Sequence, residues 1–167
     1  MPQSLPDLFA RQSRSPTPPR RPAQAPRRTK RRSAVALAGV PLFAGFSKRH
    51  LGKLADATDE VAFRPGEHIV EQGNPGETLF VILEGQAKVV RDGKTRARLV
   101  PGDFFGEVSV LDGGPRTASV VAETPVSAVR LFRKTVLDLV QQEPQLALHL
   151  LEGIARRLRE IDRSLTR

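Results

Sequence analysis

The chain contains no cysteine, tryptophan or tyrosine, and only three histidines, His50, His68 and His149. The absence of cysteine excludes disulfides, thiolate nucleophiles and cysteine-ligated metal sites. The histidines are too far apart in the sequence to show the spacing of a metal-ligand set. No stretch approaches the ~20 apolar residues that a membrane span requires. These absences are compatible with a cytoplasmic protein, which is the location we expect.

The positive charge is concentrated at the start of the chain. Residues 1–33 hold nine Arg and Lys against one acid, Asp7, and so account for +8 of the net charge of +9. The same stretch holds seven of the fourteen prolines and few large apolar residues. Such a composition buries too little surface to offset the entropy of ordering the chain. We therefore expect residues 1–33 to be a disordered basic tail, which either keeps the protein in solution or contacts nucleic acid or an anionic surface through residues 11–32.

Residues 34–46 are expected to connect this tail to the folded domain, at 47–167. Lys30-Arg31-Arg32 followed by the apolar run 34–38 has the outline of an export signal, but the run is weak and Pro41 interrupts it. Leu42, Phe43 and Phe46 are better suited to packing against the domain.

A series of short β-runs follows a first helix, which Ser47 can cap and which we expect to end near Thr58. Gly and Pro residues separate the runs, and Asp92-Gly93 between two alternating runs is a hairpin signal. The predicted strands are Glu60–Arg64, Glu67–Val70, Thr78–Glu84, Gln86–Arg91, Thr95–Val100, Thr117–Ala122 and Val126–Phe132. This pattern predicts a mainly β fold with flanking helices: a jelly-roll β-barrel with an N-terminal helix and two C-terminal helices.

The C-terminal helices are expected at Arg133–Gln142 and at about 145–165, with Pro144 at a helix start. The last helix carries a heptad seam: Ala147, Leu151, Ile154, Leu158, Ile161 and Leu165. Three uses of this seam are open: to cover a ligand as a lid, to pair with a second copy as a homodimer helix, or to pack in the core.

The segment 104–120 concentrates the groups that can bind an anion. Gly106 permits a close backbone approach, and the helical turn expected at Glu107–Leu111 presents unpaired N–H groups. Arg116 follows a Gly-Gly-Pro turn and carries a guanidinium suited to phosphate. Glu107, a carboxylate beside an anion site, requires a donor such as a sugar hydroxyl. Together these groups fit a nucleotide whose phosphate and ribose lie close together, as in a 3′,5′-cyclic nucleotide.

The sequence here resembles the cyclic-nucleotide-binding domain family. The resemblance rests on Phe105-Gly106-Glu107-Val108-Ser109-Val110-Leu111 and Pro115-Arg116-Thr117-Ala118-Ser119-Val120, which are similar to the phosphate-binding cassette of that family. It extends over about residues 40–165, including Arg64-Pro65-Gly66-Glu67, Gly73 and Phe80-Val81-Ile82-Leu83-Glu84-Gly85.

The resemblance implies a role for each cassette residue. Glu107 would accept the ribose 2′-hydroxyl, Arg116 would pair with the cyclic phosphate, and amides of Gly106, Val108 and Ser109 would complete the cradle. Thr117 would contact phosphate or a guanine amine, which permits cGMP without excluding cAMP, the ligand we expect. Ile154 and Leu158 are candidates for a lid over the base.

The function implied is that of a sensor, with the cyclic nucleotide as its ligand and with no cofactor and no metal. The chain lacks the metal cluster or acid–base pair that phosphodiester hydrolysis would require, so we do not expect an enzyme. Ligand binding would move the C-terminal helix and act on an effector protein. The alternative is an interaction or scaffold protein with a vestigial pocket, whose basic tail contacts nucleic acid or an anionic surface.

Overall fold

The computed structural model describes residues 23–24 and 30–166 of the chain. Residues 1–22 and 25–29 of the expected disordered tail lie outside these residues. Ala23–Gln24 of the expected tail form a short strand, β1, and the helix α1, Lys30–Ala38, spans the end of the tail and the start of the connecting segment. The helix differs from the expected disorder because Leu37 at its end is buried against the domain. The division into tail, connector and domain otherwise stays a prediction.

The segment expected to be a connector contributes to the core. A 3-10 turn, η1, spans Pro41–Phe43, and Leu42, Phe43 and Phe46 are all buried, as expected from the sequence. Helix α2, Lys48–Ala57, then begins where expected, because the Ser47 side chain accepts a hydrogen bond from the His50 N–H at 3.2 Å.

Two antiparallel sheets form the β-roll, as predicted. One has the order β1-β2-β9-β4-β7 and the other the order β3-β8-β5-β6. The strands are β2 (Asp59–Phe63), β3 (His68–Val70), β4 (Thr78–Glu84), β5 (Ala87–Arg91), β6 (Lys94–Leu99), β7 (Phe104–Phe105), β8 (Ser119–Ala122) and β9 (Val126–Phe132). The strands of the two sheets close over an apolar interior that includes Phe63, Phe80 and Phe105.

The hairpin between β5 and β6 turns at the dipeptide that the sequence singled out. Asp92 has φ 53° and Gly93 has φ 74°. Two consecutive residues with positive φ are the requirement of a type I′ turn, which matches the right-handed twist of the strands. The Gln72 side chain accepts a hydrogen bond from the Asp92 N–H at 3.0 Å and further holds this turn.

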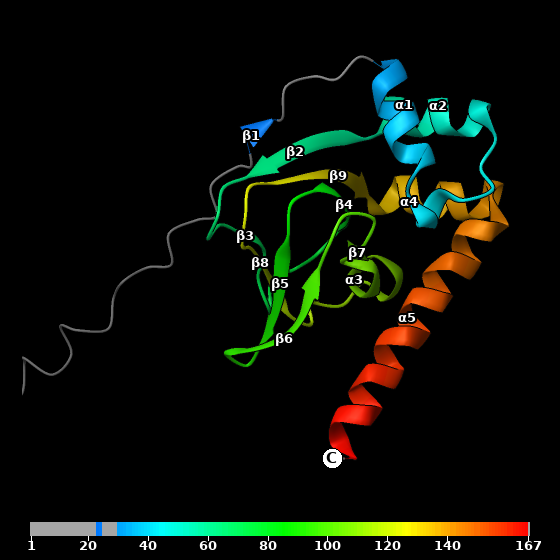
Figure 1. Ribbon diagram of the computed structural model, residues 1–167. Helices are drawn as coiled ribbons and strands as arrows, with labels where there is room; N and C mark the ends of the chain where they lie inside the picture. Colours follow the sequence, from blue (N-terminus) through cyan, green and yellow to red (C-terminus); the bar gives the residue numbers. More distant parts are fainter. Residues whose placement is uncertain (1–22, 25–29, 167) are drawn as a thin grey trace, which may run out of the picture.

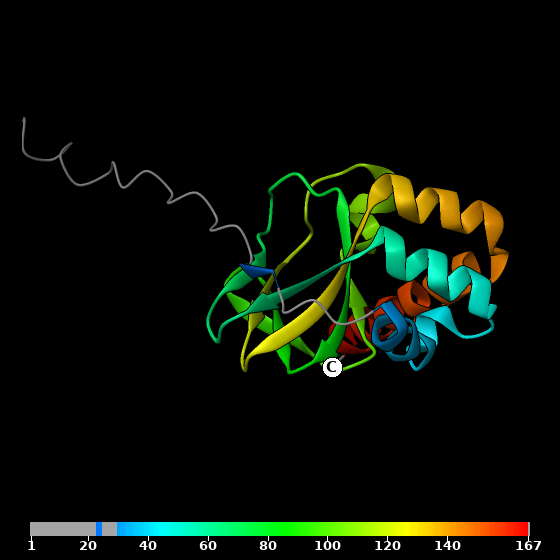
Figure 2. The ribbon, with the colours of Figure 1, turned by 90° about the horizontal axis from the view of Figure 1, so that it is seen from above.

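The remaining helices lie on one side of the roll. They are α3 (Glu107–Asp112), α4 (Arg133–Gln142) and α5 (Pro144–Leu165). Figure 1 shows α5 descending beside the roll, with α3 and β7 on the side that faces it, and Figure 2 shows α1, α2 and α4 grouped at the same end. A second apolar cluster, which includes Phe43, Leu54, Leu131 and Leu150, joins these helices to β4 and β9. None of the helices in the described part of the chain has the length and apolar character needed to cross a membrane.

Candidate functional site

The site begins at Gly106, where the chain leaves β7 and enters α3. Gly106 is the N-cap of α3 and has φ 87°, in the left-handed region that favours glycine. A Cβ here would lie 2.6 Å from the Thr78 carbonyl oxygen and 2.7 Å from Nη1 of Arg116. Glycine is therefore required both by the backbone conformation and by the close approach of two other segments.

Arg116 reaches back from the loop before β8 to the start of α3. Its side chain is buried, with 7% of its surface exposed. Nη1 donates to the carbonyl oxygens of Thr78 at 2.8 Å and Gly106 at 3.3 Å, and Nη2 donates to the Thr78 hydroxyl at 2.8 Å. The Arg116 N–H also donates to the Asn74 carbonyl at 2.8 Å, which fixes the backbone of this loop.

These side-chain partners of Arg116 are neutral oxygens. Burial lowers the pKa of the guanidinium from its ordinary value, while the nearby negative charge of Glu107 acts in the opposite direction. A guanidinium has five N–H donors. With two on Nη1 and one on Nη2 in use, the edge formed by Nε–H and the second Nη2–H is left for an acceptor.

Gly76 lies directly against this guanidinium. A Cβ at position 76 would lie 2.5 Å from Cζ of Arg116 and closer still to Nε. No side chain larger than hydrogen fits there while Arg116 keeps its position. The socket of Arg116 is thus formed by Gly76, Thr78 and Gly106.

The first turn of α3 carries the carboxylate of the site. Glu107 is 3% exposed, and its Oε1 accepts a hydrogen bond from Nη1 of Arg157 on α5. Nη2 of Arg157 donates to the Phe104 carbonyl, and its guanidinium lies over the Phe104 ring, 5.1 Å from the centroid. Glu107, for which the sequence suggested a sugar hydroxyl as donor, therefore has a protein donor in this structure.

The other residues singled out in the sequence lie at different depths. Ser109 is buried and Val108 half-buried on α3. Thr117 is exposed, and its carbonyl oxygen accepts from Nε of Arg91 at 3.2 Å. On α5, Ile154 is half-buried and Leu158 is 59% exposed. The structure thus gathers Gly106, Glu107, Val108, Ser109 and Arg116 at one place.

Sequence reasoning missed Gly76, Thr78 and Arg157. Thr78 lies 38 residues before Arg116, and Arg157 lies 50 residues after Glu107. No local spacing connects such distant positions. Arg157 also stands among other charged residues of the last helix, including Glu152, Arg156, Arg159 and Glu160, so residue type did not single it out.

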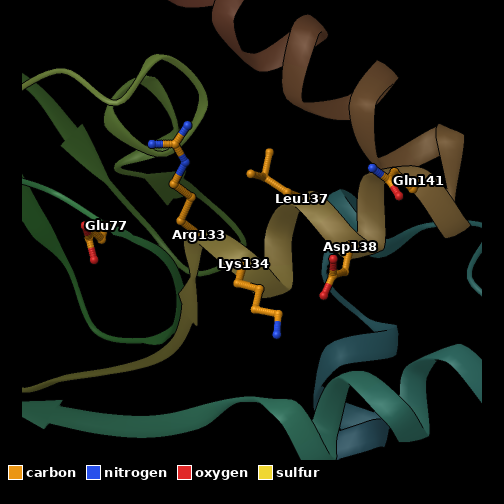
Figure 3. A pocket seen from close by; sticks show the side chains of 6 residues that line it. All are labelled: Glu77, Arg133, Lys134, Leu137, Asp138 and Gln141. Atoms are coloured by element: carbon orange, nitrogen blue, oxygen red, sulfur yellow. The ribbon is translucent and has the colours of Figure 1, made fainter.

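A separate open hollow of about 510 Å³ lies beside α4. Figure 3 shows the residues that line it: Glu77, Arg133, Lys134, Leu137, Asp138 and Gln141. The lining mixes two bases with two acids and does not include Arg116 or Glu107. The hollow adjoins the site through the backbone, since the Arg133 N–H donates to the Glu77 carbonyl at 2.8 Å, directly before Thr78.

Comparisons with known proteins find similar sequences and similar folds. A cAMP-activated global transcriptional regulator of the CRP-like type from Mycobacterium tuberculosis is 33% identical over 134 residues, which cover 77% of this chain and 60% of that protein. The solved catabolite activator protein of Thermus thermophilus has a TM-score of 0.68 and 35% identity, and the match covers 75% of this chain and 62% of that one. A cyclic nucleotide-binding domain from Methylobacillus flagellatus has a TM-score of 0.69 and 28% identity, covering 82% of this chain and 83% of that one.

The chain thus spans about 60% of the length of the first curated relatives that it matches. The profile of the cyclic nucleotide-binding domain family matches residues 60–143, a range that contains both Glu107 and Arg116. The chain belongs to the cyclic nucleotide-binding domain family, whose members similar to it are regulatory proteins.

Proposed function

We propose that this chain is a sensor of a 3′,5′-cyclic nucleotide, cAMP in preference to cGMP, and not an enzyme. The observation that carries the proposal is the socket of Arg116: a buried guanidinium with neutral partners and an uncommitted N–H edge beside the first turn of α3. A buried charge is costly unless an opposite charge pairs with it. A cyclic phosphate supplies that charge, and its oxygens accept two N–H groups in parallel.

The cassette residues then divide the ligand between them. Arg116 binds the phosphate together with the amides of Gly106, Val108 and Ser109. Glu107 accepts the ribose 2′-hydroxyl, and Thr117, which is exposed beside Arg116, contacts the phosphate or the base. The preference for cAMP is supported by relatives from two organisms whose names state that they respond to it.

The output of the sensor is the position of α5. Arg157 joins α5 to the carboxylate that is proposed to receive the ribose, so the ligand and the helix share Glu107. Ile154 and Leu158 lie on the half of α5 that includes Arg157 and are proposed to cover the base. A ligand can shift the helix only by its differential affinity for the two positions, and a tenfold difference corresponds to about 1.4 kcal/mol. An effector protein or a second copy of the chain would read this shift.

Thermal unfolding with cAMP and cGMP side by side tests the proposal. A ligand that binds only the folded state increases the free energy of unfolding, by about 2.7 kcal/mol at a ligand concentration of 100 Kd. The unfolding midpoint rises as a result. We expect a rise with both nucleotides, larger with cAMP, and none with 5′-AMP at the same concentration. No rise with either cyclic nucleotide would indicate an interaction protein with a vestigial pocket.

The variant Arg116→Ala identifies the site in the same assay. Charge-assisted hydrogen bonds are worth about 1.5–3 kcal/mol each, so we expect calorimetry to show affinity lower by about 10- to 100-fold or more. The circular dichroism spectrum should be unchanged, because Arg116 contacts a loop, a strand end and the start of α3 and is not part of either apolar cluster. Unchanged affinity would contradict the proposed placement of the phosphate.

A further inference from the structure

Thr78, the first residue of β4, binds the Arg116 guanidinium with two acceptors, which no residue of the cassette does. Both of its oxygens accept from the same guanidinium: the carbonyl from Nη1 and the hydroxyl from Nη2, each at 2.8 Å. Two acceptors on one residue thus hold the end of the guanidinium formed by Nη1 and Nη2. The plane of the group is thereby set, and the edge with Nε–H faces away from Thr78.

We propose that Thr78 is the positioning residue of Arg116, which sets the edge that the guanidinium presents to the cyclic phosphate. This inference rests on the proposed function. Arginine rotates about four side-chain bonds, and fixing it before the ligand arrives removes an entropy cost from binding. The hydroxyl supplies the part of this restraint that a substitution can remove, because the carbonyl oxygen is present whatever the residue.

The position of Thr78 suits this role. It is paired with Phe132 across the central strands β4 and β9, and the next residue, Leu79, is 1% exposed. Its acceptors therefore belong to a rigid part of the sheet and not to the loop that carries Arg116. Gly76, two residues earlier, lies directly against the guanidinium and leaves it room in this position, since a Cβ there would be 2.5 Å from Cζ.

The donor count decides whether Thr78 helps or hinders the ligand. If phosphate had to displace Thr78, removing the hydroxyl would tighten binding. The hydroxyl, however, uses one Nη2–H, and Nε–H with the second Nη2–H remain for phosphate. Thr78 and the phosphate therefore bind different donors, and removing the hydroxyl weakens binding.

The test compares Thr78→Val, which keeps the shape of the side chain, with Thr78→Ser, which keeps the hydroxyl. Calorimetry with cAMP should show affinity about fivefold lower for Thr78→Val, the loss that one hydrogen bond predicts. Thr78→Ser should stay within about twofold of the wild type, and Thr78→Val should have no further effect in an Arg116→Ala background. Equal or tighter binding by Thr78→Val would overturn the inference.

A measurement without ligand separates this inference from the proposed function. In the NMR spectrum of the unliganded protein, the Arg116 guanidinium should show slow rotation and slow solvent exchange in the wild type and in Thr78→Ser. Both should become fast in Thr78→Val. A guanidinium equally restrained in all three proteins would overturn the positioning role, even if cAMP binds. A wild type that holds the guanidinium but binds neither nucleotide would instead refute the proposed function.

Discussion

At the scale of single residues, the site depends on glycines that leave room for Arg116 as much as on Arg116 itself. Gly76 and Gly106 both lie against the Arg116 guanidinium, and a Cβ at either position would collide with it. Gly106 also has a positive φ, so its replacement would strain the backbone. Gly76 has no such constraint, which makes it a clean probe of the space around Arg116.

Gly76→Ala should displace the Arg116 guanidinium and lower the affinity for cAMP about tenfold, similar to the loss of one charge-assisted hydrogen bond. Calorimetry measures the change. Gly39→Ala is the matched control, since a Cβ there meets only the Ala36 carbonyl oxygen, at an ordinary 3.6 Å. Equal affinities for the two variants would mean that the ligand does not depend on the position of this guanidinium.

At the scale of elements, α5 is attached to the protein along a face other than its heptad seam. Leu146, Leu150 and Gly153 are the buried residues of α5, and Arg157 continues this face to Glu107. His149 adds a contact through Nδ1, 3.0 Å from the Leu42 carbonyl oxygen. The N-terminal half of α5 is thus anchored in the helical layer, and its C-terminal half is held at the cassette by one arginine.

Gly153 permits the close packing of α5 on the cassette. A Cβ there would lie 3.0 Å from Cε1 of the buried Phe104 ring and closer still to Cζ. Gly153→Ala should destabilise the protein by about 1–3 kcal/mol through overpacking, despite the better helix propensity of alanine.

Differential scanning calorimetry checks this expectation, because each kcal/mol of lost stability lowers the unfolding midpoint by about 2–4 °C. The control is Gly52→Ala on α2, where a Cβ meets nothing within 4 Å. That variant should gain about 0.5–1 kcal/mol. A stabilised Gly153→Ala would show that α5 does not approach Phe104 closely in solution.

Arg157→Ala should release the C-terminal half of α5 in the unliganded protein. The variant loses the hydrogen bonds to Glu107 and to the Phe104 carbonyl, so amide hydrogen exchange over 154–165 should become faster. Arg156→Ala, an exposed neighbour on the same helix, serves as the control and should leave exchange unchanged. The same exchange rate in both variants would argue against Arg157 as the link between α5 and the cassette.

At the scale of the whole molecule, the β-roll and the helical layer leave the heptad seam outside the core. Leu151, Leu158, Ile161 and Leu165 are between 42% and 78% exposed, whereas Ala147 and Ile154 are half-buried. Of the three uses predicted for the seam, core packing is therefore wrong for its four exposed members. Covering a ligand and pairing with a second copy both stay predictions.

Pairing through the seam predicts a monomer–dimer equilibrium that sedimentation velocity can follow. The double variant Leu151→Glu with Leu165→Glu places like charges along the seam and should shift the protein to monomer. Leu148→Glu is the control, because Leu148 is 53% exposed on the same helix but lies off the seam. The opposite result is a wild type that stays monomeric at a protein concentration about 100-fold above the one used to measure cAMP binding. That result would leave covering the ligand as the use of the seam.

Much of the architecture could be predicted because its signals are local. Strands Thr78–Glu84 and Val126–Phe132 and helix Arg133–Gln142 have the bounds expected from the sequence. Alternation, turn dipeptides and capping residues act over a few positions and are visible in the chain. Strand β7 and helix α1 were missed, since the first has two residues and the second spans the boundary between the expected tail and the expected connecting segment.

The sequence by itself determined most of the order of elements and led to the prediction of an anion site at Gly106, Glu107 and Arg116, because these inferences follow from residue type and short-range spacing. Only the tertiary structure decided which groups surround them. Thr78 meets Arg116 because the segment just before β4 pairs with the loop that carries Arg116, through the Pro75–Pro115 bridge and the hydrogen bond from the Arg116 N–H to the Asn74 carbonyl. Arg157 meets Glu107 because α5 packs on Phe104 through Gly153. Contacts between residues 38 and 50 positions apart depend on how strands and helices pack, which no pattern of neighbouring residues encodes.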